Sequence, residues 1–255
     1  MTHRFVIAGA GFTTNEYLPG LSTDGFADAE ITVRFADEGT PATTAGSDVR
    51  RVIGPDGLDG IINPVSMECR LLDHFRDPDR RAWQLRQMAP IFTTILRKLV
   101  LHAGAVEVDG GVIGFVGETG LGKSTLVRFL AGREYSFVAD DLLPVRFTPV
   151  LSAPVGERLA PIKELHFLRR TNTDSVTIEH LGDLDALQRL ARNGFGEHGD
   201  SASWAFQFDA YHRIVESVPV FDLTIPNDLS ALVGVEEALG NLQMPSAEAG
   251  PAGTS

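Results

Sequence analysis

Eight consecutive residues and the threonine after them form the stretch of this sequence best suited to chemistry, because they match the phosphate-loop pattern G-x-x-x-x-G-K-S. Glycines allow a tight curl in which several backbone N–H groups converge on one polyphosphate. The lysine adds a mobile positive charge, and the serine hydroxyl is suited to bind a hydrated Mg²⁺ that also contacts phosphate oxygens. The residues are Gly117, Glu118, Thr119, Gly120, Leu121, Gly122, Lys123, Ser124 and Thr125.

The segments on either side of this loop predict how it is held. Residues 112–116 are almost continuously apolar, which predicts a strand buried on both faces. Residues 126–131 have the apolar character of a helix, and Gly132 is suited to end it. A strand, a glycine-rich loop and a helix in this order are the context that a phosphate site requires.

Two adjacent acids, Asp140 and Asp141, follow a further apolar stretch at residues 135–139. We expect this stretch to return as a strand beside residues 112–116, so that both carboxylates face the bound phosphates. Together with Ser124, the pair could bind Mg²⁺, and one acid could accept the proton of an attacking hydroxyl. A solvated Asp-Asp turn is the alternative.

His102 is the third candidate for chemistry, because it ends the apolar run at residues 99–101. It could stabilise charge near a transferred phosphoryl group or form a hydrogen bond with an aspartate. A histidine at the end of a strand can also be structural, so the residue alone leaves both interpretations open.

The order of these features resembles the catalytic core of HPr kinase/phosphorylase and its HPr-kinase-like relatives. Leu101 and His102 come first, followed by residues 106–110, the loop, and residues 138–141. The spacing from position 123 to position 140 is short among phosphate-loop proteins, which makes the combination specific. The resemblance is strong over residues 98–146, loose to about residue 240, and absent from the N-terminal zone.

The resemblance implies an α/β fold with a phosphate-loop core of the HPr kinase and phosphoenolpyruvate-carboxykinase-like type. It implies an ATP- and Mg²⁺-dependent kinase that transfers the γ-phosphoryl group to a serine hydroxyl of a peptide or protein. Lys123 would bind phosphates and Ser124 would bind Mg²⁺. Asp140 and Asp141 would be metal ligand and catalytic base, in an order left open, and His102 matches the family's active-site histidine.

Part of the sequence departs from the bifunctional members of that family, in which a Gly- and Arg-rich segment follows the aspartates and contributes to phosphorylase activity. Here the equivalent residues 149–163 offer only Gly156, Glu157 and Arg158, and Arg158 could either contact phosphate or have an ordinary surface role. The layout is similar to short HPr-kinase-like proteins associated with peptide modification, including lasso-peptide kinases. Two other functions stay open: a kinase for a small molecule such as free serine, and a nucleotide-binding regulator without catalysis.

Composition limits the partners and the surroundings. The 34 acidic and 22 basic side chains give a formal net charge of −12, which disfavours binding to nucleic acid or to an anionic membrane. Cys69 is the single cysteine, so no internal disulfide can form, and we expect it to be buried. With no signal peptide or membrane span in view, we expect a cytoplasmic protein, and we leave a homo-oligomer open.

Changes of composition predict three parts of the chain. Residues 1–76 read as a small β-rich N-terminal domain, residues 77–243 as a phosphate-loop kinase-like domain, and residues 244–255 as a disordered tail. Gly9 and Gly11 lack the third glycine of a dinucleotide-binding loop, so we do not expect that ligand here.

The periodicity of apolar residues predicts further elements in the second part. Residues 78–98 read as helical, with a break or kink at Pro90. Residues 176–178 read as a strand that pairs with residues 165–167, and residues 184–191 as a helix. A later helix should bury one face made of Trp204, Phe208, Tyr211 and Val215.

Overall fold

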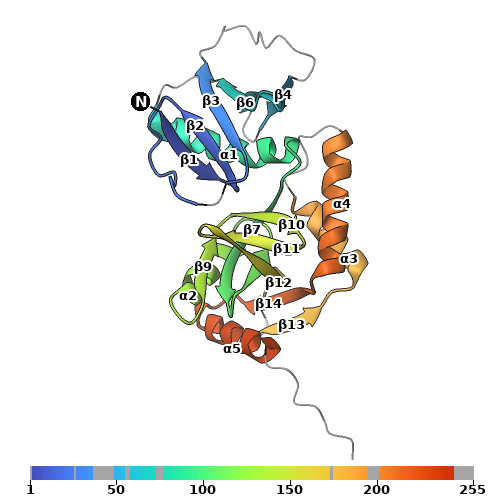
Figure 1. Ribbon diagram of the computed structural model, residues 1–255. Helices are drawn as coiled ribbons and strands as arrows, with labels where there is room; N and C mark the ends of the chain where they lie inside the picture. The colour runs from blue at the N-terminus through green and yellow to red at the C-terminus, as the bar shows by residue number, and fades with distance from the viewer. Residues whose placement is uncertain are drawn as a thin grey trace, which may run out of the picture.

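The fold is a mixed α/β arrangement built on two sheets, as the sequence predicts, and it is seen here in a computed structural model (Figure 1). The structure describes residues 2–25, 27–36, 49–54, 58–72, 77–172, 175–194 and 201–243. The predicted tail at residues 244–255 lies outside the described residues. The described segments have few helices and many strands, and the two sheets occupy opposite ends of the molecule.

The N-terminal sheet has six strands in the order β1-β2-β3-β6-β5-β4. Its strands are β1 (His3–Ile7), β2 (Ala10–Thr14), β3 (Glu30–Ala36), β4 (Arg50–Ile53), β5 (Asp59–Asn63) and β6 (Glu68–Leu72). The glycine-containing stretch at residues 8–11 makes a two-residue hairpin turn, in which Ala8 and Gly9 both have positive φ. Cys69 is buried in this part, as expected, and burial raises the pKa of its thiol.

Helix α1 (Pro78–Ile95) covers the N-terminal sheet, and its buried residues share one hydrophobic cluster with that sheet. The expected break at Pro90 is wrong, because the helix runs continuously through it. The Thr93 and Thr94 hydroxyls both donate to the Pro90 carbonyl, at 2.8 and 2.9 Å. The boundary at residue 76 stays a proposal, while α1 itself packs with the residues that precede it.

The second sheet has eight strands, seven of them in the order β11-β10-β7-β8-β12-β14-β13, with β9 on the side of β7. Strand β12 lies parallel to both β8 and β14, while β11 pairs with both β10 and β12. The strands are β7 (Leu99–Val108), β8 (Gly111–Val116), β9 (Ser136–Ala139), β10 (Leu142–Thr148), β11 (Val150–Val155), β12 (Arg158–Thr171), β13 (Thr177–His180) and β14 (Val220–Pro226).

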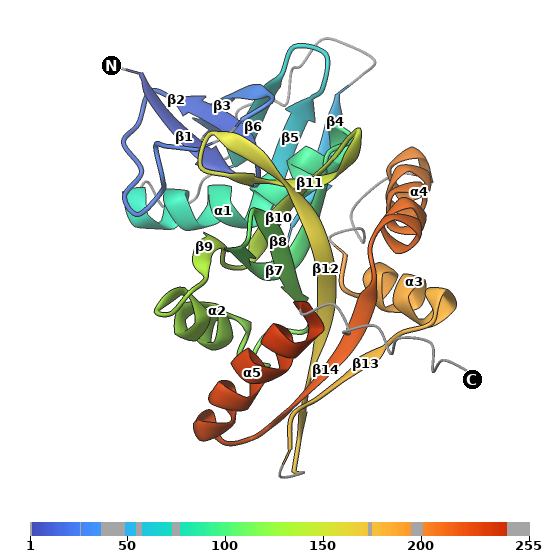
Figure 2. The ribbon, with the colours of Figure 1, turned by 60° about the horizontal axis from the view of Figure 1, so that its bottom comes forward.

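Helices cover both faces of this sheet, as Figure 2 shows. One face packs against α2 (Lys123–Ala131) and α5 (Leu232–Gln243), which follows the 3-10 turn η3 (Leu229–Ala231). The other face packs against α3 (Asp183–Arg192) and α4 (Ser201–Ser217). All six residues of β8 are buried, which confirms the expectation from its apolar sequence and explains why polar side chains are absent from it.

Two predicted strand pairings are wrong. Strand β9 does not return beside β8; it pairs antiparallel with β7. Both edges of β8 are already used, by β7 on one side and by β12 on the other. Residues 176–178 likewise do not pair with residues 165–167, because β13 pairs with β14, which separates it from β12.

The predicted buried face of α4 is wrong for two of its four residues, while Tyr211 is buried and Val215 packs against the core. Trp204 and Phe208 are 43% and 56% exposed, as Trp83 of α1 is at 44%. The positions that are buried are Ser203, Gln207, Ala210, Tyr211 and Ile214. Gln207 Nε2 donates to Thr94 Oγ1 of α1 at 3.4 Å, so a polar contact between two helices occupies a position that apolar periodicity assigns to the surface.

Polar contacts join the two parts of the molecule. Asp28, in the N-terminal part, accepts hydrogen bonds from Lys98 Nζ at 2.7 Å and from Arg146 Nη2 at 3.0 Å. Arg146 Nη2 also donates to the Gly9 carbonyl at 3.1 Å, so the hairpin turn of β1 and β2 rests on β10. Within the part of the chain that the structure describes, no helix combines the length and apolar character needed to span a membrane.

Candidate active site

The glycine-rich loop connects the end of β8 to the first residue of α2. Gly117, Gly120 and Gly122 have φ values of 155, 91 and 90°, which side-chain-bearing residues rarely adopt. Gly122 is the N-cap of α2, and no side chain caps that end of the helix. The positive end of the helix and its first backbone N–H groups are therefore available to an anion.

Lys123 is held against the loop, although it carries a charge. Its side chain is buried, and Nζ donates to the carbonyls of Gly117 at 2.6 Å and of Glu118 at 3.0 Å. Burial lowers the pKa of Lys123, while the charges of Asp141 and Asp140 act in the opposite direction. An anionic ligand in the loop would offer the ammonium group a stronger partner than two neutral carbonyls.

His102 and Asp141 form a pair beside the loop. His102 Nε2 donates to Asp141 Oδ1 at 2.8 Å, and strands β7 and β10 hold the pair together because Leu142 lies opposite His102. Asp141 has a φ of 81°, an uncommon value for an aspartate, in the short link between β9 and β10. The hydrogen bond from His102 is the main cause that lowers the pKa of Asp141, so its carboxylate is ionised at neutral pH.

One open cavity of about 290 Å³ brings most of the predicted site residues together. Its walls combine hydrogen-bond donors of the loop, one cation, one anion and an imidazole. This composition suits a polyphosphate that must meet a second reactant at the same place. The lining residues are His102, Thr119, Gly120, Gly122, Lys123, Ser124, Thr125 and Asp141.

Asp140 points elsewhere than its neighbour. It lines an adjoining cavity of about 210 Å³, together with residues of the N-terminal part. Its Oδ2 lies 3.4 Å from Arg128 Nη2, while its Oδ1 is buried and has no hydrogen-bond partner among the described residues. Gly117, Glu118 and Leu121 belong to the loop but do not line the larger cavity.

Arg170 is a residue of this site that sequence reasoning missed. It lies near the end of β12, where Nε donates to the Leu121 carbonyl at 2.9 Å and Nη1 to the Pro226 carbonyl at 2.7 Å. A Cβ placed on Gly122 would lie 2.6 Å from Arg170 Nη2. No local pattern marks Arg170, because the parallel pairing of β12 with β8 is what brings it to the loop.

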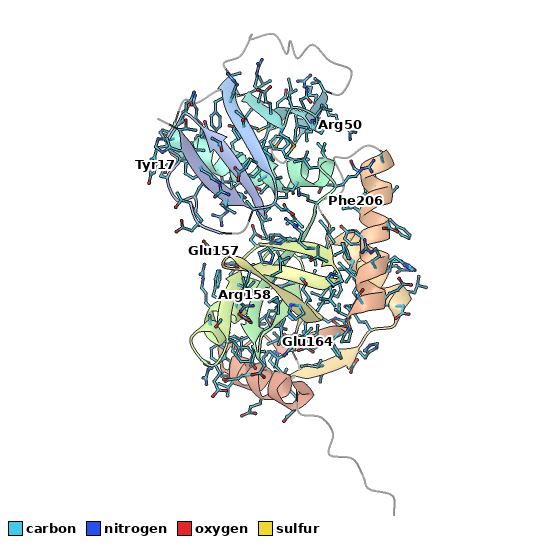
Figure 3. All side chains as sticks on the ribbon, viewed as in Figure 1. Tyr17, Arg50, Glu157, Arg158, Glu164 and Phe206 are labelled. Atoms are coloured by element: carbon cyan, nitrogen blue, oxygen red, sulfur yellow. The ribbon has the colours of Figure 1, made fainter. Side chains whose placement is uncertain are left out.

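Arg158, which the sequence left as a phosphate ligand or a surface residue, lies away from the loop. Figure 3 labels it beside Glu157, at the turn between β11 and β12. Its guanidinium pairs with Glu107, which lies near the C-terminal end of β7, whereas His102 lies near the N-terminal end of that strand. This ion pair supports a structural role for Arg158.

Two oxygen donors of the kind that suits Mg²⁺ lie in this region, one lining each of the two cavities. The Ser124 hydroxyl lines the larger cavity, and the buried Oδ1 of Asp140 lacks a partner among the described residues. Both are hard oxygen donors of the kind that Mg²⁺ prefers. Across the described residues, no group of three or more histidine, cysteine, aspartate or glutamate side chains is arranged to hold a metal ion, so phosphate oxygens would have to supply further ligands.

Comparisons with known proteins add little to this geometry. No protein-family model matches the chain, and no curated protein matches it. Among solved structures, the Hpr(Ser) kinase/phosphatase from Coxiella burnetii aligns with 56% of this chain and 95% of its own, at 12% sequence identity and a TM-score of 0.35. At that identity and score the similarity is distant.

Proposed function

We propose that this protein is an ATP- and Mg²⁺-dependent kinase that transfers the γ-phosphoryl group to a serine hydroxyl of a peptide or protein. One observation carries the proposal: the hydrogen-bonded pair of His102 and Asp141 lines the same cavity as Lys123 and Ser124 of the phosphate loop. The sequence order that resembles HPr-kinase-like proteins supports the choice of a serine acceptor.

Binding comes first in this mechanism. The loop N–H groups and the N-terminal end of α2 would hold the phosphates of ATP, and Lys123 would turn from the loop carbonyls to the terminal phosphates. Ser124 and Asp140 would hold Mg²⁺, which when bound neutralises charge that develops on the phosphate oxygens.

Transfer needs a second group that handles the acceptor proton. The serine oxygen would attack the γ-phosphorus in line, so that an O–P bond forms while the bond from the γ-phosphorus to the bridging oxygen breaks and ADP leaves. Asp141 would orient the hydroxyl and receive its proton, since its carboxylate is ionised and fixed by His102. A weak base suffices if the proton leaves late in a loose transition state.

Incubation with γ-labelled ATP, Mg²⁺ and serine-containing peptides tests the proposal. Asp141→Asn and Lys123→Ala should each lose several kcal/mol of transition-state stabilisation, on the order of a thousandfold in kcat/KM, because each removes a group that acts on the reacting atoms. His212→Ala, an exposed change on α4, is the matched control.

Three results of that assay have different meanings. Transfer to a peptide that both variants abolish supports the proposed roles. Transfer that survives in both variants contradicts the assignment of the site. ATP binding without transfer to any acceptor would favour a nucleotide-binding regulator, and transfer to free serine alone would favour a small-molecule kinase.

A further inference from the structure

The smaller cavity beside Asp140 lies where the two parts of the molecule meet. Six of its nine lining residues come from residues 1–76, Arg86 comes from α1, and Asp140 and Leu142 come from the link between β9 and β10 and from the start of β10. Its walls are formed by the end of β1 and the hairpin turn, by residues 20–22, and by Arg86 of α1. The nine residues are Val6, Ile7, Ala8, Gly20, Leu21, Ser22, Arg86, Asp140 and Leu142.

This cavity adjoins the phosphate site. Asp140 and Asp141 are consecutive, and each lines one of the two cavities. Arg86 lines the smaller cavity, and its positive charge also helps to lower the pKa of Asp141, which lines the larger one. A kinase needs an acceptor site close to the place where the γ-phosphoryl group is held, and the two cavities are joined along the chain by the consecutive residues Asp140 and Asp141.

Arg86 gives the cavity a preference for anions. It is the one cation in the lining, and its side chain is exposed rather than packed against the N-terminal sheet. Among the described residues it forms no hydrogen bond or ion pair. The carboxylate of Asp140 pairs with Arg128 at 3.4 Å, so Arg86 is the charge of the lining that an acidic group on the occupant could pair with.

We propose, resting on the proposed kinase function, that this cavity is the acceptor site and that it selects a peptide segment in which an acidic side chain lies close to the serine. A cavity of about 210 Å³ accommodates one or two side chains of an extended segment. The apolar walls, from Val6, Leu21 and Leu142, suit the aliphatic part of such a segment. The N-terminal part thereby acts as the substrate-recognition wall of the site.

Binding of labelled peptides tests this inference without requiring catalysis. The probes are three fluorescein-labelled heptapeptides that share one central serine and differ only in two flanking residues, which are glutamate, glutamine or lysine. Fluorescence anisotropy is measured on the full chain with Mg²⁺ and a non-hydrolysable ATP analogue. We expect the glutamate peptide to bind at least about tenfold more tightly than the glutamine peptide, as a charge-assisted contact to Arg86 would provide.

Variants then assign the preference to Arg86. Arg86→Gln should bring the ratio of the two dissociation constants close to one, and Arg86→Glu should favour the lysine peptide. Affinity for the nucleotide analogue should stay unchanged in both. Arg97→Gln is the matched control, since Arg97 is an exposed arginine just after α1 that lines neither cavity.

The outcomes separate this inference from the proposed function. Equal binding of the three peptides by the unaltered protein, or a ratio that Arg86→Gln leaves intact, overturns the acceptor site. If the protein prefers the acidic peptide through Arg86 but transfers no phosphoryl group from ATP to any peptide, the peptide-binding site is supported and the proposed kinase function is contradicted. Free L-serine at millimolar concentration, added as a competitor, displaces the glutamate peptide only if the cavity recognises a free amino acid, which also overturns the peptide assignment.

Discussion

At the scale of single residues, the hydrogen-bonded pair of His102 and Asp141 places a carboxylate beside the glycine-rich loop, which is what the proposed transfer to a hydroxyl requires. Asp141 lies in a backbone conformation that few aspartates adopt, and the structure keeps it there with a hydrogen bond from an imidazole. Strained residues of this kind cost about 1–3 kcal/mol and are concentrated at functional sites. Asp141 lines the same cavity as Lys123 and Ser124, as expected if its strained backbone serves a functional site.

The pH dependence of activity should report this pair. Activity requires the ionised form of Asp141, and His102 lowers the pKa of that carboxyl, so the rate should fall only below the ordinary titration range of an aspartate, near pH 4. His102→Ala removes the main cause of the shift, so the acid limb of kcat/KM should move to higher pH. Profiles that extend from about pH 3 to pH 7 measure this, with His212→Ala as control; an unmoved limb contradicts the role of His102.

At the scale of elements, strand β12 supports the loop from behind. Its parallel pairing with β8 brings Arg170 against the Leu121 carbonyl, while the same guanidinium holds the Pro226 carbonyl at the end of β14. Arg170 thus ties the loop to the ends of β12 and β14, two segments that are distant from it in sequence. Arg170 is a positioning residue, because it acts on the curl of the loop and does not line the cavity.

Arg170→Met should therefore raise KM for ATP and lower kcat/KM by roughly 10- to 100-fold, since small displacements of binding groups have effects of this size. Arg170→Lys should restore part of the loss, because an ammonium can still reach one carbonyl. Gly122→Ala should have a similar effect, since a Cβ there meets Arg170 and the φ of 90° disfavours it. Steady-state kinetics with varied ATP are the measurement, and a wild-type KM in all three variants rules out the positioning role.

The sequence predicts the local features of the site well and the long-range ones poorly. The loop, His102 and Asp141 follow from motif and spacing, and the structure brings them to one cavity. Arg170 and Arg86 could not be found this way, because strand order and helix placement bring them in from other segments. The pairing of β9 with β7 was missed for the same reason, because apolar periodicity predicts that a segment is a strand but not which strand it pairs with.

At the scale of the whole molecule, Asp28 joins the N-terminal part to the part that contains the glycine-rich loop. It accepts hydrogen bonds from Lys98 and Arg146, and Arg146 is itself buried and holds the Gly9 turn. Although burial by itself raises the pKa of Asp28, the contacts with Lys98 and Arg146 outweigh it and leave the pKa lowered. The same contacts keep one wall of the smaller cavity in place.

Asp28→Asn should reduce the free energy of unfolding by about 2 kcal/mol, the scale of lost hydrogen bonds to charged groups. Because the folded-state pKa of Asp28 is lowered, its contribution is complete above the unfolded-state value near pH 4 and disappears as the pH falls through the folded-state pKa. Urea unfolding of both proteins should show a constant difference from pH 5 to 7 that shrinks toward pH 3. A difference that does not depend on pH contradicts the ionic account.

The fourteen residues of β12 have a consequence for how the chain acquires its structure. This strand stands between β8, which precedes it by about forty positions, and β14, which is made last among the strands. During synthesis, the edge of β12 that pairs with β14 stays unpaired until residues 220–226 have been made. Strand pairings between segments far apart in the sequence form slowly and leave apolar strand edges exposed until they form. We therefore expect assembly of the eight-stranded sheet to be the slow and aggregation-prone stage of folding.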